Sequence, residues 1–549
     1  MQKRHSIYSL LIAVLVFVSC QSNDPVITPK QLTIDSVTVN NQQLRQGVRL
    51  HPVAVDSAII RIFFSSSIDA SKLDASLLFV NSMSNSTFQA QASSNPRELV
   101  LKATRKLNYL STYRLYIQAG ANLGQSIADN YEYSFVTQLD STDKFERIHD
   151  DSLLTRIQQQ TFRYFWDHAH PVSGLARERF GSGETVTSGG SGFGAMSIVA
   201  AIERGFITRD QGFAHLQKMV QFLATQAQRF HGAFPHWING TTGQAIAFST
   251  KDNGADLVET GLLMQGLLSV QQYFKNGNTA EKALCNNIQQ LYEAVEWNFF
   301  QQNGQQALYW HWSPNYHWDM NMRISGWNES LIVYVLAASS PTYPISKEVY
   351  TQGWARNGAM RNGRSFYNIT LPLGEDKGGP LFFAHYSFLG LDPRNLSDSY
   401  ASYMEQNTAH ARINLAHCID NPLRHYGYSA DSWGLTASDI PSGYTASSPT
   451  NDGGTIAPTA AIASLPYTPT ESMQAIRFFY YTLGDKLWGD YGFKDAYNLN
   501  QSWFANSYLA IDQGPIIVMI ENHRSALLWN LFMQHTDIQA GLSKLGFSY

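Results

Sequence analysis

Three acidic residues lie close together in the segment KDNGADLVETG, residues 251–261. If the segment is helical, Asp252, Asp256 and Glu259 occupy positions i, i+4 and i+7 and share one face. Neighbouring carboxyl groups are the usual machinery of general acid–base hydrolysis. The alternative is a helix start, with Asp252 or Asn253 as N-cap and Asp256 in the first turn. Because capping leaves Glu259 unexplained, we predict that all three acids are catalytic.

A fourth acid, Glu329, follows Trp327 and precedes the apolar run 331–336. Desolvation beside apolar groups favours the protonated carboxyl and raises its pKa. A carboxyl that is still protonated near neutral pH can give its proton to a leaving oxygen. The alternative is an acid held at a helix N-terminus by the helix dipole. We predict that Glu329 is a general acid.

Aromatic and polar side chains gather in the segments around these acids. The chain has 12 Trp, 28 Tyr and 30 Phe, and flat rings offer apolar faces to the C–H faces of sugars. Imidazole and guanidinium groups can bind the hydroxyls. Each such residue alone is more often structural, but together they predict a carbohydrate cleft. The candidate binding residues are His236, Trp237, Trp312, Arg323, Trp327, His385, Tyr386 and Trp433.

The composition fits a neutral polar substrate and excludes other classes of protein. The formal net charge is −4, which excludes a basic nucleic-acid binder. The chain contains no GxSxG, HExxH or Walker motif, so serine-hydrolase, zinc-protease and NTPase chemistry are not indicated. Cys285 and Cys418 lack the clustered spacing of a zinc site, and we expect buried free thiols. We expect neither a metal nor a cofactor.

The N-terminus has the pattern of an export signal. A positively charged start and an apolar run over residues 7–18 precede Cys20, and the run is too short to span a bilayer. The segment resembles a bacterial lipoprotein signal, which implies a signal peptide over 1–20, lipidation of Cys20 and a tether over 21–30. The alternative is an uncleaved anchor. We expect an exported lipoprotein in the periplasm or on the surface of a Gram-negative bacterium, held at the membrane only by its lipid.

Two different periodicities divide the remaining chain. Residues 31–138 alternate apolar and polar side chains between turn clusters, which predicts an antiparallel Ig-like β-sandwich. Residues 139–150 carry mixed charges and are expected to be a linker. From 151 to 549 the period is helical, and helices alternate with long glycine- and aromatic-rich loops. This pattern favours a ring of helix pairs whose loops build a cleft.

Several consecutive segments of the helical part carry a family resemblance. They are FRYFWDHAHPVSGLARERF (162–180), TSGGSGFGAMSIVAAIERGFI (187–207), HGAFPHWING (231–240), KDNGADLVETGLLMQGLL (251–268) and GWNESLIVYVLAASSPTYPI (326–345). Together they resemble the glucoamylase-like family of bacterial β-1,2-glucan hydrolases, glycoside hydrolase family 144. The resemblance covers most of residues 151–549. The lipoprotein signal and the Ig-like module lie outside it.

The resemblance implies a fold, an activity and residue roles. The fold would be an all-α (α/α)6 toroid, and the reaction would be metal-independent, inverting hydrolysis of β-1,2-glucan to sophorose or short sophoro-oligosaccharides. The family's acidic motif falls on Asp252, Asp256 and Glu259, and its Trp-Asn-Glu motif falls on Glu329 as general acid. The general base is expected within the first group, with Asp256 the first choice. Acid and base of an inverting enzyme should stand about 6.5–9.5 Å apart.

Two alternatives to this function stay open. The chain could be a non-catalytic glycan-binding lipoprotein, or the same toroid could act on another β-glucan linkage. The presence of all four acids argues against loss of catalysis. We expect a β-glucan oligosaccharide or polysaccharide as the partner, no nucleic acid, and a monomer. The sequence does not separate endo from exo action.

Overall fold

The computed structural model describes residues 31–72, 77–79, 87–91 and 93–549. The predicted signal peptide with Cys20 and the tether 21–30 lie outside the described residues. The chain divides into two compact units. The larger unit comprises Phe135–Tyr549 together with Arg49–Val55 and Leu107–Thr112, and the smaller unit holds most of the N-terminal strands.

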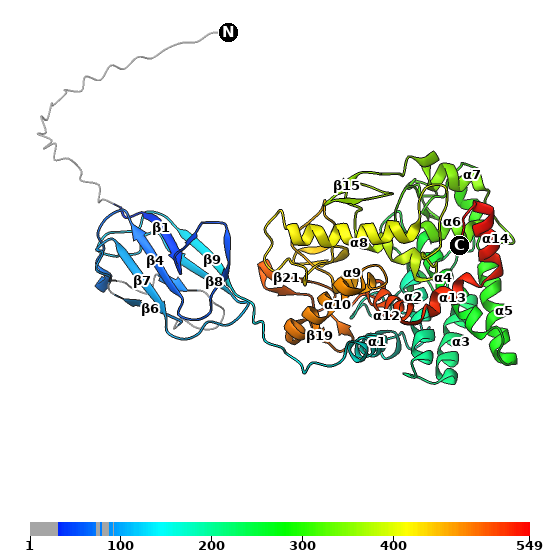
Figure 1. The fold of residues 1–549 in the computed structure, drawn as a ribbon, viewed down its shortest axis with the longest axis horizontal. Coiled ribbons are helices and arrows are strands. Elements are labelled where there is room, and N and C mark those ends of the chain that lie inside the picture. Colours follow the sequence, from blue (N-terminus) through cyan, green and yellow to red (C-terminus); the bar gives the residue numbers. More distant parts are fainter. Residues whose placement is uncertain (1–30, 73–76, 80–86, 92) are drawn as a thin grey trace, which may run out of the picture. The chain divides into compact units, whose positions relative to one another are not determined.

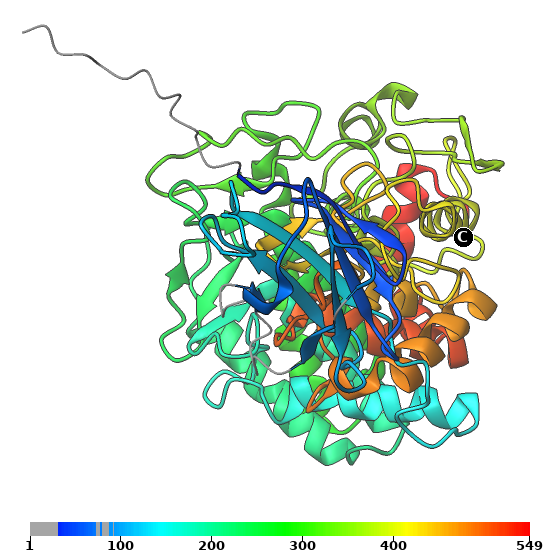
Figure 2. The same ribbon diagram turned by 90° about the vertical axis from the view of Figure 1, so that its left-hand side faces the viewer.

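The N-terminal strands form two sheets, as the alternating pattern predicts. In β4 every second side chain, including Ile60 and Ile62, is buried, and in β1 Val37 and Val39 are buried. The sheet orders are β2-β1-β4-β7-β6 and β3-β9-β8-β5, and the pairings of β1, β4 and β7 are antiparallel (Figure 1). Figure 2 shows the same strands from a perpendicular direction. The bounds are β1 Ile34–Val39, β2 Gln42–Leu44, β3 Arg49–Val53, β4 Ile59–Phe64, β5 Leu77–Phe79, β6 Phe88–Gln91, β7 Glu98–Ala103, β8 Thr112–Ile117 and β9 Tyr131–Thr137, with a 3-10 turn η1 at Ala70–Lys72.

The larger unit is built from inner and outer helices, as expected for a toroid. Helices α2, α4, α6, α9 and α12 are buried along most of their length, and helices α1, α3, α5, α10 and α14 pack on their outer side (Figure 1). An all-round apolar helix must be buried, whereas an amphipathic one can face water. The helix bounds are α1 Asp150–Trp166, α2 Ser188–Glu203, α3 Arg209–Thr225, α4 Leu257–Phe274, α5 Thr279–Glu293, α6 Leu331–Ser339, α7 Lys347–Val349, α8 Tyr403–Asp420, α9 Pro458–Ala463, α10 Pro469–Arg477, α11 Gly484–Leu487, α12 Ala510–Ser525, α13 Leu527–Met533 and α14 Thr536–Leu545.

One inner position of the ring is not an α-helix. Between α6 and α9 the chain makes two 3-10 turns, η5 and η6, and α8 packs outside η5. Short strands also occur in the connecting loops, where the sequence showed little strand pattern. They are β10 Thr185–Thr187, β11 Trp237–Asn239, β12 Ala245–Ile246, β13 Ala255–Asp256, β14 His311–Trp312, β15 Ser365–Phe366, β16 Ile369–Thr370, β17 Ala437–Ile440, β18 Gly443–Ala446, β19 Trp488–Gly489, β20 Gly492–Phe493, β21 Tyr497–Asn498 and β22 Trp503–Phe504. The 3-10 and π turns are η2 Trp297–Gln301, η3 Tyr350–Trp354, η4 Arg356–Gly358, η5 Leu381–Ala384, η6 Tyr386–Leu389, η7 Phe478–Thr482 and η8 Leu499–Gln501.

Glycines bring α2 and α4 unusually close together. A Cβ on Gly192 would stand 2.3 Å from the backbone oxygen of Leu262, and one on Gly266 would stand 2.1 Å from the backbone oxygen of Gly192. Both distances are far below van der Waals contact, so only glycine fits at these positions. The close contact holds the N-termini of the two helices side by side, and the acids lie there.

Two further observations concern the predicted thiols and membrane spans. Cys285 and Cys418 are free and buried, as predicted. Among the described residues, no helix combines the length and apolar character needed to cross a bilayer.

Candidate functional site

Helix α4 begins later than the predicted acidic stripe requires. Its first residue is Leu257, and Asp256 is the N-cap: its Oδ1 accepts hydrogen bonds from the backbone N–H of Val258 (3.0 Å) and Glu259 (2.9 Å). Only Glu259 therefore lies within the helix, and the prediction of three acids on one helical face is wrong. The carboxyl groups nevertheless meet, because the loop before α4 folds Asp252 back to the helix N-terminus.

Glu259 is held by the N-terminus of α2. Its Oε2 accepts hydrogen bonds from the backbone N–H of Gly189 (2.7 Å) and from the hydroxyl of Thr187 (3.2 Å). A Cβ at position 189 would stand 2.8 Å from that oxygen. The close helix contact and the glycine therefore fix one oxygen of Glu259 and leave the other facing His236.

Two histidines complete a group that we call the acid cluster: Asp252, Asp256, Glu259, His236 and His311. His236 Nδ1 lies 3.1 Å from Asp256 Oδ2, and its Nε2 lies 4.0 Å from Glu259 Oε1. His311 Nε2 lies 3.4 Å from Asp252 Oδ2. Strand β14 pairs with β13, which sets His311 opposite Asp256. His236 was among the predicted binding residues, and His311 was not.

Burial and mutual charge set the proton affinities of the cluster. Burial lowers the pKa of His236, but the charges of Glu259 and Asp256 outweigh it and raise that pKa to about 9. Burial alone would favour neutral Asp256, yet its hydrogen bond with His236 and the neighbouring His311 keep its pKa below the ordinary value. Burial and the charge of Asp256 raise the pKa of Asp252 to about 7. At neutral pH an imidazolium therefore compensates buried carboxylates.

The acid cluster also contains a possible ligand set for a cation. The ligand atoms of His236, Asp252 and Asp256 all lie within 4.8 Å of one another. Metal binding needs a neutral imidazole, whereas the raised pKa of His236 keeps it protonated at neutral pH. A cation would therefore have to displace the proton of His236 to bind here.

Glu329 lies immediately before Ser330, the N-cap of α6. The backbone oxygen of Glu329 accepts a hydrogen bond from the Ser387 hydroxyl. Glu329 is half-buried. Burial raises the pKa of the Glu329 carboxyl to about 7, and the charges of Asp256 and Glu259 add to the rise. The structure thus places Glu329 within electrostatic range of the acid cluster.

A second group of acids lies at the start of α12 and was not predicted. Asp495 and Asp512, the acid pair, are each 4% exposed. Asp495 Oδ2 accepts a hydrogen bond from the backbone N–H of Asp439 (2.6 Å), whose carboxylate binds Arg179 Nη1 at 3.1 Å. Burial, followed by the charge of Asp495, raises the pKa of Asp512 well above its ordinary value. Burial raises the pKa of Asp495 to about 7.

Tyr386 is affected by the charges of the acid pair and of the other acids. After burial, the charges of Asp512, Glu329 and Glu259 contribute to raising the pKa of the Tyr386 hydroxyl well above its ordinary value. Its ring packs on Phe193 of α2, with centroids 5.2 Å apart. The predicted binding residue Tyr386 is therefore within electrostatic range of both groups of acids.

Three other predicted binding residues make packing or surface contacts instead. Trp433 is completely buried in the core. His385 is buried, stacks on Tyr467 and bonds Ser464 through Nε2 at 3.0 Å. Arg323 is exposed and donates to the backbone oxygen of Gln352 at 2.8 Å. The first two side chains pack in the core, and the third joins two surface loops.

The other aromatic candidates are half-buried or line a pocket. Trp237 follows His236 and packs against Phe248, with ring centroids 4.8 Å apart. Trp312 is enclosed by aromatic neighbours, including Phe299 at 5.9 Å. Trp327 borders a pocket of about 340 Å³, the Trp327 pocket, which is lined by Ser325, Gly326, Trp327, Asn328, Arg356, Ala359, Met360, Gly374, Glu375 and Phe383.

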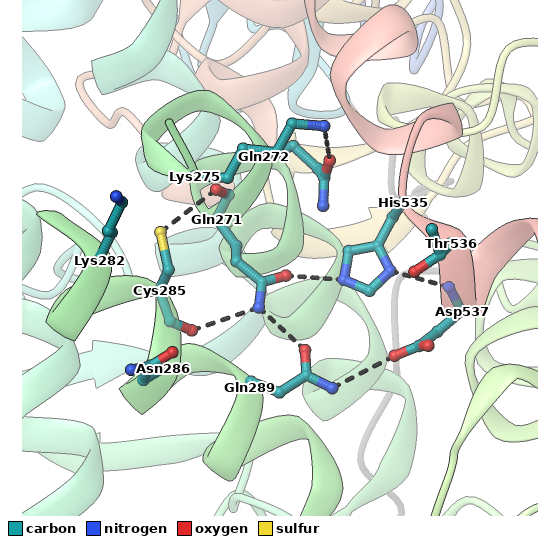
Figure 3. Close-up of a pocket in the computed structure, with 10 residues that line it drawn as sticks. All are labelled: Gln271, Gln272, Lys275, Lys282, Cys285, Asn286, Gln289, His535, Thr536 and Asp537. Carbon is teal, nitrogen blue, oxygen red and sulfur yellow. Dashed lines mark hydrogen bonds between the residues drawn. The ribbon is translucent and has the colours of Figure 1, made fainter. Parts of the chain in front are cut away.

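A different pocket, of about 500 Å³, lies between α4, α5 and α14 (Figure 3). Its polar side chains bond one another: Gln271 Nε2 donates to Gln289 Oε1 at 2.9 Å, and His535 Nε2 lies 2.7 Å from Gln271 Oε1. Gln289 Nε2 in turn donates to Asp537 at 3.2 Å. Because these groups already satisfy one another, we do not assign this pocket to the functional site.

Family models match both parts of the chain. The Glycoamylase model, a glucoamylase family, matches residues 321–536. A bacterial Ig-like domain model matches residues 30–137. The matched ranges agree with the helical and β-sandwich parts of the structure.

Characterised relatives are also similar over long stretches. An exo β-1,2-glucooligosaccharide sophorohydrolase (non-reducing end) from Parabacteroides distasonis is 47% identical over 418 residues, which is 72% of this chain but 58% of that protein. An endo-β-1,2-glucanase structure from Chitinophaga pinensis is 52% identical with a TM-score of 0.72, covering 73% of this chain and 99% of that one. A β-1,2-glucanase structure from Parabacteroides distasonis is 40% identical with a TM-score of 0.71, covering 93% of this chain and 74% of that one.

Proposed function

Because the chain belongs to the glucoamylase-like family of glycoside hydrolases, family 144, we propose that it hydrolyses β-1,2-glucan to sophorose or short sophoro-oligosaccharides. The relatives that act on this glucan support the substrate. The observation that carries the proposal is Glu329, a half-buried carboxyl whose pKa is raised to about 7 beside Asp256 and Glu259. Such a group is protonated often enough at neutral pH to act as an acid.

The proposed reaction uses Glu329 as the acid and a carboxylate as the base. Glu329 gives its proton to the glycosidic oxygen as the bond from that oxygen to the anomeric carbon breaks. A water oxygen bonds to the anomeric carbon from the opposite face, and its proton passes to the base, so the configuration inverts. No metal ion takes part in this scheme.

The base is better sought at Asp252 than at Asp256, the first choice from the sequence. Both oxygens of Asp256 are engaged, one by the helix cap and the other by His236. Asp252 has one neighbour within ion-pair distance among the described residues, His311 at 3.4 Å. We propose Asp252 as the base, and the acid–base separation of about 6.5–9.5 Å stays a prediction.

A reducing-sugar assay on β-1,2-glucan tests the proposal. Glu329→Gln keeps the shape of the side chain but removes the proton donor, and we expect turnover to fall by about 10³-fold. Asp252→Asn should cause a loss of similar size. The control is Glu405→Gln on the outer helix α8, an exposed acid, which should keep wild-type turnover.

Full turnover in Glu329→Gln would remove the residue from its role. A protein that binds the glucan but never releases reducing ends would instead be a glycan-binding lipoprotein. Activity on another β-glucan and not on the 1,2-linked polymer would favour the other-linkage alternative. The product profile on a long chain separates exo action, with a single disaccharide product, from endo action, with a ladder of sizes.

We also propose that Cys20 is lipidated and anchors the exported protein. The support is the charged start and apolar run before Cys20. Labelling with a fatty-acid analogue in a bacterial host should mark the wild type and not Cys20→Ser. Equal labelling of both proteins would contradict the proposal.

A further inference from the structure

The acid cluster brings nitrogen and oxygen donors together at distances close to those around a bound metal ion. One ligand atom each of His236, Asp252 and Asp256 lies within 4.8 Å of the other two. His236 Nδ1 is 3.1 Å from Asp256 Oδ2. Ligands bound tetrahedrally at about 2.1 Å from a zinc ion stand about 3.4 Å from one another. A small movement of these side chains therefore lets one ion contact all three.

A fourth donor is aimed at the same two aspartates. His311 is 8% exposed, and its Nε2 lies 3.4 Å from Asp252 Oδ2 and 3.8 Å from Asp256 Oδ2. Within the described chain no hydrogen bond engages the His311 ring, and its Nδ1 is buried without a partner. A buried neutral imidazole that points at two carboxylates without a hydrogen bond to either is available as a metal ligand.

The surroundings of these donors match the outer shell of a metal site. A ligating histidine usually directs its second ring nitrogen to a carboxylate, and ligating carboxylates are themselves hydrogen-bonded. His236 Nε2 lies 4.0 Å from Glu259 Oε1, and Glu259 is held by the backbone N–H of Gly189. Asp256 Oδ1 accepts hydrogen bonds from Val258 and Glu259 at the start of α4. The atoms that remain for an ion, His236 Nδ1 and Asp256 Oδ2, face each other.

The kinds of donor and their exposure select the ion. Imidazole nitrogen combined with carboxylate oxygen suits divalent transition metals such as Zn²⁺, whereas Mg²⁺ and Ca²⁺ prefer oxygen ligands. The His236 side chain is 24% exposed, so an ion can reach the cluster from solvent. On binding, the ion replaces the imidazolium proton, and it supplies the positive charge that otherwise compensates the carboxylates.

We propose that the acid cluster binds a divalent transition-metal ion, with His236, Asp252 and Asp256 as ligands and His311 as a further donor. The ion acts as an inhibitor and not as a cofactor, and this consequence rests on the proposed function. An ion held by Asp252 prevents that carboxylate from accepting the proton of the attacking water. Metal binding and hydrolysis therefore exclude each other.

A cobalt titration tests the site without using activity. Co²⁺ binds the same donors as Zn²⁺, and its visible absorption strengthens when nitrogen and carboxylate ligands replace water. We expect the untagged wild type to develop this absorption, and Zn²⁺ to remove it by competition. In His236→Gln and in Asp252→Asn we expect the affinity for Co²⁺ to fall by more than about 100-fold, because loss of an outer-shell partner alone costs about 10–100-fold.

The control variant is His317→Gln, which removes an exposed histidine from the loop after β14. It should bind Co²⁺ as the wild type does. Equal Co²⁺ affinity in His236→Gln, Asp252→Asn and the wild type would overturn the proposal, and so would a wild type that binds no Co²⁺. The two substitutions lie in different segments, so if one variant fails to fold the other still decides.

Turnover on β-1,2-glucan provides the second measurement. We expect saturating Zn²⁺ to lower turnover of the wild type and of His317→Gln by about 10²-fold or more, and a chelator to restore it. Full turnover while cobalt occupies the site would overturn the inhibitory role. A wild type that never cleaves the glucan would instead defeat the proposed function, and the cobalt titration would still decide about the metal site.

Discussion

The acid cluster and the acid pair are two groups of buried carboxyls in the same ring of helices, and they are stabilised in different ways. In the acid cluster His236 supplies a positive charge, and its pKa is raised to about 9. In the acid pair, burial raises the pKa of Asp495 to about 7 and that of Asp512 well above its ordinary value. In the acid cluster a cation compensates the negative charge, whereas in the acid pair the carboxyl groups keep their protons.

Backbone contacts reinforce this difference. Asp256 and Glu259 accept hydrogen bonds from the N-termini of α4 and α2, where the helix dipole favours negative charge. In the acid pair, Asp495 and Asp512 hydrogen-bond each other, and Asp495 Oδ2 also accepts a hydrogen bond from the backbone N–H of Asp439. Within the acid cluster the pKa of Asp256, which accepts two backbone N–H bonds and contacts His236, stays below the ordinary value, whereas burial raises the pKa values of Glu259 and Asp252. Glu329, which is half-buried, resembles the carboxyls of the acid pair, because its pKa is also raised.

The largest expected effect comes from breaking the cluster at its cap. Asp256→Ala removes two backbone acceptor contacts and leaves His236 without its closest carboxylate. Breaking a buried ion pair costs about 3–5 kcal/mol, so we expect the free energy of unfolding to fall by that amount in a denaturant titration. Asp252→Ala, which removes no cap, should cost clearly less. Equal midpoints for Asp256→Ala and the wild type would show that the pair contributes no stability.

Replacing His236 should have the next largest effect, and the effect should depend on pH. Its folded pKa of about 9 exceeds the model-peptide value of about 6.5. This stabilisation is complete below about pH 6.5 and is lost as the pH rises through about 9. His236→Gln should therefore reduce the free energy of unfolding by about 3 kcal/mol at pH 6 and by little at pH 9.5.

The exposed His317 provides the control for this prediction. His317→Gln should not change the free energy of unfolding at either pH. If the cost of His236→Gln were the same at pH 6 and pH 9.5, the imidazolium would not be what stabilises the cluster.

Much of the framework of this comparison could be predicted from the sequence. Apolar alternation in residues such as Ile60 and Ile62 predicted the sandwich, and the helical period from residue 151 onward predicted the ring of helix pairs. The four predicted catalytic acids could be identified because each lies at a characteristic spacing within a short segment. In each case the signal was local in the sequence.

The parts that could not be predicted depend on contacts between distant segments. His311 meets Asp256 through strands of two residues each, and so short a strand has no periodicity. Nothing in the sequence links Asp439 to Asp495 or Asp512. Trp433 shows the opposite error, because an aromatic residue in a loop can equally fill a core.

The acid pair should respond in the opposite sense to the cluster. Because the folded pKa values of Asp495 and Asp512 are raised, their protonated form favours folding. Stability from this source is present near pH 4 and is lost as the pH rises through about 7. Asp512→Asn removes one titrating group, so it should raise the free energy of unfolding by about 2 kcal/mol at pH 8.

At pH 4 the same substitution should be close to neutral, because the wild-type pair is then protonated. The exposed Asp490 offers a control, and Asp490→Asn should not alter the free energy of unfolding at either pH. A destabilised Asp512→Asn at pH 8 would mean that the pair is held by contacts that this comparison does not include.

The smallest expected effect concerns Tyr386, which is within electrostatic range of both groups. The charges of Asp512, Glu329 and Glu259 contribute to raising the pKa of its hydroxyl. Tyr386→Phe keeps the ring contact with Phe193, so the free energy of unfolding should change by less than about 0.5 kcal/mol. Turnover on β-1,2-glucan should fall about 10-fold, equivalent to about 1.4 kcal/mol, because the hydroxyl no longer orders water and sugar between the acids. Unchanged kcat in Tyr386→Phe would show that the cluster and the pair act without this bridge.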